Sequence, residues 1–141
     1  MSETDPELFL EAQDTVWAEV TRELAEGKKT GHWMWFVFPQ LAELGQSPIS
    51  QLYGLHDLDE AAAYLDHPEL KRRLVEVADL MLTHEGTPAK QILGQVDAMK
   101  LRSSMTLFSR VPEAPDSFAR VLDAFYDGRP CTETLRLIGR N

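Results

Sequence analysis

The chain lacks the features that mark several large classes of protein. It has one cysteine in 141 residues, so no disulfide can form within it. That residue, Cys131, follows a proline with no recognisable motif around it, and we interpret it as a partly buried thiol. The N-terminal stretch MSETDPELF has no apolar signal-peptide core, and the longest apolar run is far shorter than the roughly 20 residues that span a bilayer. These absences predict a cytoplasmic protein with no membrane association.

Positive charge is also scarce. The chain has 14 Lys and Arg against 23 Asp and Glu, a net charge of -9. Such an acidic protein repels phosphate backbones over long range, which argues against general nucleic-acid binding. Apolar residues make up 43% and charged residues 26%, which are ordinary globular values. Together with the length, they predict one domain over residues 1–141.

Alternating apolar and polar residues, the pattern of a half-buried strand, are missing, whereas helix signals recur along the whole chain. Asp5-Pro6-Glu7 begins a helix whose apolar stripe continues to Leu24 before Gly27. His67-Pro68-Glu69 begins another, and we expect Asp97 to cap a third. The prediction is therefore an all-α, single compact orthogonal multi-helix domain of about seven or eight helices.

The run WMWFVF, residues 33–38, allows two interpretations. Its composition favours a strand. A strand needs a partner, however, and no other segment offers one. A central helix that is apolar all round fits better, with Pro39 ending or kinking it.

His32, directly before this run, is either a helix-entry residue bonded to backbone or a general acid/base, because imidazole titrates near neutral pH. Trp33 and Trp35 cannot share one helix face, so one is expected in the core while the other points elsewhere. No histidine pair has the spacing of a zinc site, and the sequence predicts neither a metal nor a cofactor.

A second polar cluster lies in DAMKLRSSMTLF, residues 97–108. On a helix, Asp97, Lys100, Ser103 and Ser104 flank an apolar stripe. They form either an ordinary helix start with an ion pair and back-bonded serines, or a patch for an anionic or hydroxylated ligand. Lys100-x-x-Ser103 reverses the Ser-x-x-Lys order of serine acyl enzymes, so it gives little support for a nucleophile.

Five segments, GKKTGHWMWFVFPQL, GQSPISQLYGL, EAAAYLDHPEL, DAMKLRSSMTLF and TETLRLIG, together resemble the domain-of-unknown-function family numbered 1810, whose members are sometimes labelled calpastatin-like. The resemblance covers about Phe9 to Gly139 and implies a compact helical domain. It brings no catalytic residue. It does mark many polar positions, more than core packing explains, and this favours a pocket.

Two functional hypotheses follow. The first is a site for a small phosphorylated or nucleotide-like anion, with His32 as proton carrier and Lys100 as charge stabiliser if a reaction takes place. The second is a non-enzymatic protein-interaction module in which the same polar residues are structural and the protein partner is unidentified. The candidate ligand-binding residues are Lys29, His32, Trp33, Trp35, Gln40, Asp97, Lys100, Ser103 and Ser104.

Overall fold

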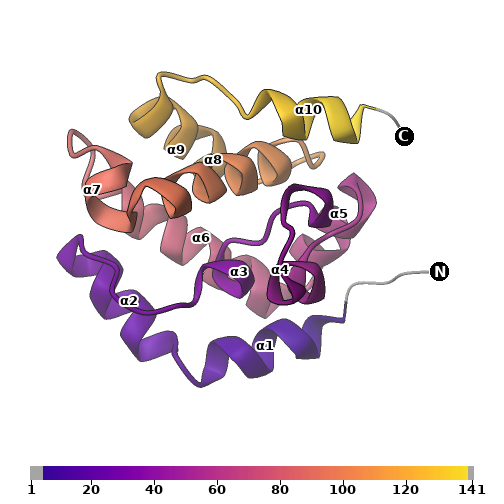
Figure 1. Ribbon diagram of the computed structural model, residues 1–141, viewed down its shortest axis with the longest axis horizontal. Coiled ribbons are helices and arrows are strands. Elements are labelled where there is room, and N and C mark those ends of the chain that lie inside the picture. Colours follow the sequence, from indigo (N-terminus) through magenta and orange to yellow (C-terminus); the bar gives the residue numbers. More distant parts are fainter. Residues whose placement is uncertain (1–4, 140–141) are drawn as a thin grey trace.

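The computed structural model describes residues 5–139, and within them the secondary structure is almost purely helical (Figure 1). The prediction of an all-α domain is confirmed, and the described residues form ten α-helices, slightly more than expected. One 3-10 turn and a lone parallel bridge between Leu41 and Leu55 complete the inventory. The helices are α1 Pro6–Asp14, α2 Trp17–Glu26, α3 Met34–Val37, α4 Pro48–Tyr53, α5 Leu58–Asp66, α6 Pro68–Leu82, α7 Ala89–Leu93, α8 Gln95–Ser109, α9 Asp116–Tyr126 and α10 Thr132–Ile138; the 3-10 turn is η1 Ala42–Leu44.

The prediction of one continuous helix from Pro6 to Gly27 is wrong, because the helix is interrupted at Thr15 and Val16 and forms α1 and α2 instead. Thr15 Oγ1 donates to the Ala12 carbonyl, and Val16 leaves the helical region. Two consecutive β-branched residues disfavour helix at this point. The apolar stripe survives the break, since Phe9, Val20 and Leu24 are all buried.

The segment 33–38 is helical only over the four residues of α3. Met34, Phe36 and Val37 are buried, as a central helix requires, while Trp35 stays partly exposed. The prediction that Asp97 caps a helix is wrong, because α8 begins two residues earlier, after Gly94. Gly94 precedes the helix with a φ of 90°, a conformation that favours glycine. Because α8 starts at Gln95, the Asp97 carboxylate lies in its first turn and can bind a partner outside the helix.

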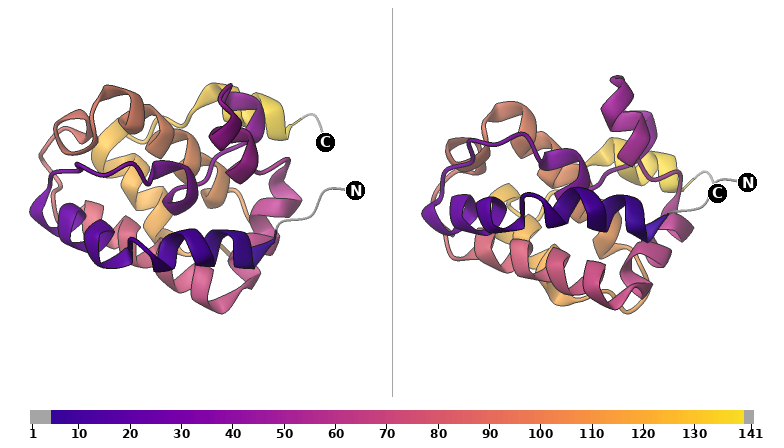
Figure 2. Two further views of the ribbon diagram at one scale, coloured as in Figure 1. Left: turned by 60° about the horizontal axis from the view of Figure 1, so that its bottom comes forward. Right: turned by 90° about the horizontal axis from the view of Figure 1, so that it is seen from below.

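The core forms around α6 and α8. Helix α8 packs against α5, α7, α9 and α10, while α6 packs against α1, α2, α5 and α9. Figure 2 shows the indigo α1 and α2 running along the pink α6. Leu101, Met105 and Phe108, which form the apolar stripe of α8, are fully buried.

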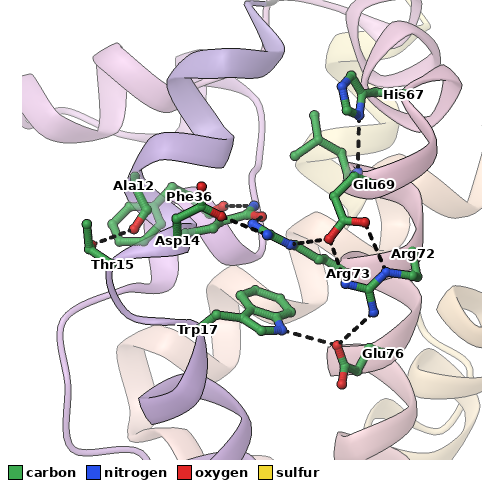
Figure 3. A network of polar contacts seen from close by, with 12 residues as sticks. Ala12, Asp14, Thr15, Trp17, Phe36, His67, Glu69, Arg72, Arg73 and Glu76 are labelled. Carbon is green, nitrogen blue, oxygen red and sulfur yellow. Dashed lines mark hydrogen bonds and ion pairs between the residues drawn. The ribbon is translucent and has the colours of Figure 1, made fainter.

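A polar seam locks α1 onto α6 (Figure 3). Buried Gln13 donates through Nε2 to the Phe36 carbonyl at 2.8 Å and to the Tyr64 hydroxyl at 3.1 Å. Arg73 donates to Gln13 Oε1 at 3.2 Å and pairs with Asp14 at 2.7 Å. Because Gln13 bonds the α3 backbone, this seam also fixes the start of the segment that leads to the candidate site.

Candidate functional site

A cavity of about 460 Å³ opens between the segment 35–50, the first half of α8 and the start of α10. Small-molecule sites commonly have volumes of roughly 300–1,000 Å³, so the cavity is large enough for a ligand. Its lining combines apolar, hydroxyl, amide, thiol and charged side chains. The lining residues are Trp35, Gln40, Leu44, Gly45, Gln46, Ser47, Ser50, Val96, Met99, Lys100, Ser103, Cys131 and Glu133.

One face of α8 forms a wall of this cavity. Val96, Met99, Lys100 and Ser103 recur at spacings of three, one and three, which places them on the same side of the helix. Their exposure falls along this face: Val96 is 65% and Met99 66% exposed, whereas Ser103 is 8% exposed. The wall is therefore apolar at its exposed end and polar at its buried end.

Lys100 and Trp35 form a cation–π pair on the cavity wall. Lys100 Nζ lies 4.9 Å from the ring centroid of Trp35. Asp97 Oδ1 is 3.7 Å from the same ammonium, a loose contact, and the Lys100 side chain is 22% exposed. Gln40 lies beside the pair and also lines a small adjoining crevice with Tyr53. This arrangement presents a cation, an indole and an amide to one space.

Lys29 and Trp33 form a second cation–π pair that is sealed from solvent. Lys29 Nζ lies 5.0 Å from the Trp33 ring, 2.7 Å from Asp97 Oδ2 and 2.6 Å from the Gly31 carbonyl oxygen. Its side chain is only 7% exposed. Asp97 therefore connects the two pairs, but its close contact is with the buried lysine.

Glu23, which the sequence reasoning missed, completes the buried pair. Its Oε1 accepts from the Trp33 indole N–H and from the backbone N–H groups of Thr30 and Gly31, all at 2.9–3.0 Å. Burial raises the pKa of this carboxyl, but hydrogen bonds from Gly31, Thr30 and Trp33 outweigh it and lower the pKa from 4.5 to about 2. Helical spacing could have identified Glu23 as a buried residue, since it lies three residues after Val20 and therefore on the buried side of α2.

Cys131 is also part of the cavity wall. Ser103 Oγ donates to the Met99 carbonyl at 3.2 Å and contacts Cys131 Sγ at 3.4 Å. Burial raises the pKa of the thiol, but hydrogen bonds from Ser103 and from the start of α10 outweigh it, so the pKa is lowered. No sequence pattern indicates this contact, because Cys131 meets Ser103 only through the packing of α10 on α8.

The structure distributes the predicted site residues over three environments. Trp35, Gln40, Lys100 and Ser103 line the cavity. Lys29, Trp33 and Asp97 lie behind it in the buried network. His32 is exposed outside the lining, and Ser104 is fully buried with no hydrogen-bond partner for its Oγ among residues 5–139.

In the described part of the chain, no group of three or more His, Cys, Asp or Glu side chains is arranged to hold a metal ion. Over the same residues, no helix has both the length and the apolar character that crossing a bilayer requires.

Comparison with known proteins identifies the family. Residues 3–138 match the family described as "Protein of unknown function (DUF1810)", and the chain belongs to it. The chain is similar to the conserved hypothetical protein Rv1873 from Mycobacterium tuberculosis, whose crystal structure extends to 1.38 Å. The two share 44% identity over 96% of each chain, with a TM-score of 0.93. No curated protein sequence matches the chain.

Proposed function

We propose that this member of a family without an assigned function binds a small anionic ligand, phosphorylated or nucleotide-like, in the cavity beside Trp35. The observation that carries the proposal is the position of Lys100, whose ammonium lies over a partly exposed indole on the wall of a cavity of about 460 Å³. A ligand anion at Lys100 would gain a charge-assisted hydrogen bond, and an attached ring would meet the indole.

The local charge balance supports an anion at this point. Asp97 lies 2.7 Å from Lys29 but 3.7 Å from Lys100, so its charge is mainly compensated by the buried lysine. Lys100 is therefore the less compensated of the two lysines, and it lies on the cavity wall. Glu133, the acidic residue of the lining, pairs with Arg136 on its own helix. An acidic protein thus keeps a cation at the cavity wall.

Neutral polar groups would add selectivity. Gln40, Ser47 and Ser103 also line the cavity. An amide both donates and accepts, so it suits the edge of a heterocycle or a sugar hydroxyl. The proposal is restricted to binding, because His32, the candidate proton carrier, lies outside the lining.

A specific observation favours a second candidate, the non-enzymatic interaction module. Lys29, Trp33, Asp97 and Glu23 form a buried network whose polar groups bond one another, which is what a structural role requires. Under this alternative, Lys100 extends the same network, and the function depends on an external protein surface.

A thermal-shift screen separates the two candidates. The wild type, Lys100→Met and the exposed-lysine control Lys90→Met are screened against nucleotides and sugar phosphates. A ligand at 100 times its dissociation constant adds about 2.7 kcal/mol of stability and raises the melting temperature. We expect the shift in the wild type and in Lys90→Met but not in a folded Lys100→Met. No shift with any anion, together with a much less stable Lys100→Met, would favour the interaction module.

A further inference from the structure

We infer that the preferred ligand is a free amphiphilic phosphate, with its anionic head at Lys100 and Ser103 and an apolar tail along Met99 and Val96. This inference rests on the proposed anion site and names its ligand class. It comes from the order of side chains along α8, where the cavity wall changes from polar at its buried end to apolar at its exposed end.

Charge and burial indicate where the anionic head of the ligand binds. Lys100 is the lysine of the cavity lining, its side chain is mostly buried, and Ser103 beside it is 8% exposed. A phosphate here accepts charge-assisted hydrogen bonds from the Lys100 ammonium in a site largely shielded from water, where such bonds are stronger than at the surface. Ser103 can also donate to it once its hydroxyl turns away from the Met99 carbonyl. An anion held near the mouth would instead lie against Val96 and Met99, which offer it no donor side chain.

The exposed apolar residues indicate where the apolar tail of the ligand lies. In the part of the chain that the structure describes, the exposed large apolar side chains are Ile49, Leu52, Val96 and Met99. All four lie on α4 or α8, and two of them line the cavity. Scattered exposed apolar residues are ordinary on protein surfaces, but these are concentrated on two helices that flank one cavity. From Val96 to Ser103 the helix rises by about 10 Å, which gives a short tail a continuous path.

Charge argues for a free molecule rather than a lipid in a bilayer. The chain carries a net charge of -9, so an anionic membrane surface repels it. Lys100 also lies within a concave wall and is only 22% exposed, so a headgroup fixed in a flat bilayer would have to leave its surface to reach it. The unbranched Met99 side chain can adapt its shape to a flexible tail.

Calorimetric titration with monoalkyl phosphates from methyl to octyl, below their micelle concentrations, tests the inference. The proteins are the wild type, Met99→Gln, Lys100→Met and the control Leu52→Gln, which changes an exposed apolar residue outside the lining. Full burial of a methylene contributes about fourfold in affinity, so we expect a gain of roughly two- to fourfold for each added methylene. Met99→Gln should reduce octyl phosphate affinity but leave methyl phosphate affinity unchanged, whereas Lys100→Met should weaken both.

The outcomes separate this inference from the proposed function. If nucleotides or methyl phosphate bind through Lys100 but affinity does not rise with chain length, the tail assignment is wrong and the anion site stands. If no phosphate of any kind binds, both proposals fail. Equal losses in Met99→Gln and Leu52→Gln would also overturn the tail assignment. Sedimentation with phosphatidylcholine vesicles containing phosphatidate should show no binding, and binding to vesicles without binding to octyl phosphate would overturn the choice of a free ligand.

Discussion

Trp33 and Trp35 are two residues apart, and each has a lysine ammonium over its ring, at 5.0 and 4.9 Å, yet their surroundings differ in every other respect. Trp33 is buried, its indole N–H bonds Glu23, and its lysine bonds Asp97 and a carbonyl. Trp35 is partly exposed and lines a cavity, and its lysine has only a loose contact with Asp97.

The comparison shows that a cation–π pair does not by itself indicate a binding site. Around Trp33 the protein supplies all the polar partners, so the unit holds the loop between α2 and α3 in place. Around Trp35 the Lys100 ammonium and the Gln40 side chain lie on the wall of a cavity. The difference arises from the two-residue spacing, because Trp33 caps α3 and Trp35 lies inside it, and positions two apart on a helix are separated by about 200° around its axis.

Removing the carboxylate of the sealed pair should have the largest effect. Glu23→Ala deprives a buried indole N–H and two backbone N–H groups of their acceptor. Several hydrogen bonds to one charged group are lost together, so we expect the free energy of unfolding to fall by about 4 kcal/mol in urea denaturation. Glu26→Ala, an exposed change on the same helix, is the control and should stay within about 0.5 kcal/mol. Similar losses in the two variants would contradict the structural role of Glu23.

Exchanging the two lysines for methionine should give opposite results in two assays. Lys29→Met removes the close partner of Asp97, and we expect a loss of about 2–3 kcal/mol in the free energy of unfolding. Lys100→Met keeps the aliphatic stem near Trp35 and should cost only about 1 kcal/mol, a value for a cation–π contact that is partly shielded from water. Binding of anions should disappear in Lys100→Met and persist in a folded Lys29→Met. Equal destabilisation by both changes would remove the distinction between the pairs.

The stability supplied by Glu23 should depend on pH. Its folded pKa, about 2, lies below the ordinary value of 4.5. The charged carboxylate therefore stabilises the fold fully above pH 4.5, and this contribution is lost as the pH falls toward 2. Glu23→Gln lacks the titration, so the stability difference between wild type and variant should be about 3 kcal/mol at pH 7 and should be mostly lost near pH 2 in urea denaturation. A difference that stays constant over this range would show that the charge of Glu23 does not matter.

The sequence predicted the fold class better than the helix boundaries. Pro68 and Gly27 mark real helix ends, because proline fits the first helical turn and glycine the left-handed C-cap. The break at Thr15 and Val16 was not predicted, since the apolar stripe runs through it unchanged. The β-branched pair Thr15-Val16 weakens the helix at this point, and the separate packing of α1 and α2 on α6 accommodates the break.

Only those parts of the candidate site that lie within a single helix could be predicted from the sequence. The joint position of Lys100 and Ser103 follows from helical spacing, and both line the cavity. The pairing of Lys29 with Asp97 joins residues 68 positions apart, and the approach of Cys131 to Ser103 joins two helices, so no local pattern encodes either contact. The separation of Trp33 from Trp35 was predicted, but which of them faces the core depends on Glu23.

The smallest predicted effect is on the reactivity of Cys131, which reports on the surroundings of the Lys100–Trp35 pair. Ser103 Oγ lies 3.4 Å from the thiol sulfur, and hydrogen bonds outweigh burial, so the pKa of Cys131 is lowered and the thiolate fraction rises. Ser103→Ala removes one of these donors, and alkylation by iodoacetamide at pH 7.5 should slow by about threefold, equivalent to roughly 0.7 kcal/mol of differential hydrogen bonding. Ser109→Ala, on the same helix but bonded to the Thr106 carbonyl, should leave the rate unchanged. A ligand in the cavity should protect Cys131 in the wild type, because the thiol lies on the same wall as Lys100. Alkylation that is indifferent both to Ser103→Ala and to a bound anion would mean that the Trp35 side is as closed as the Trp33 side.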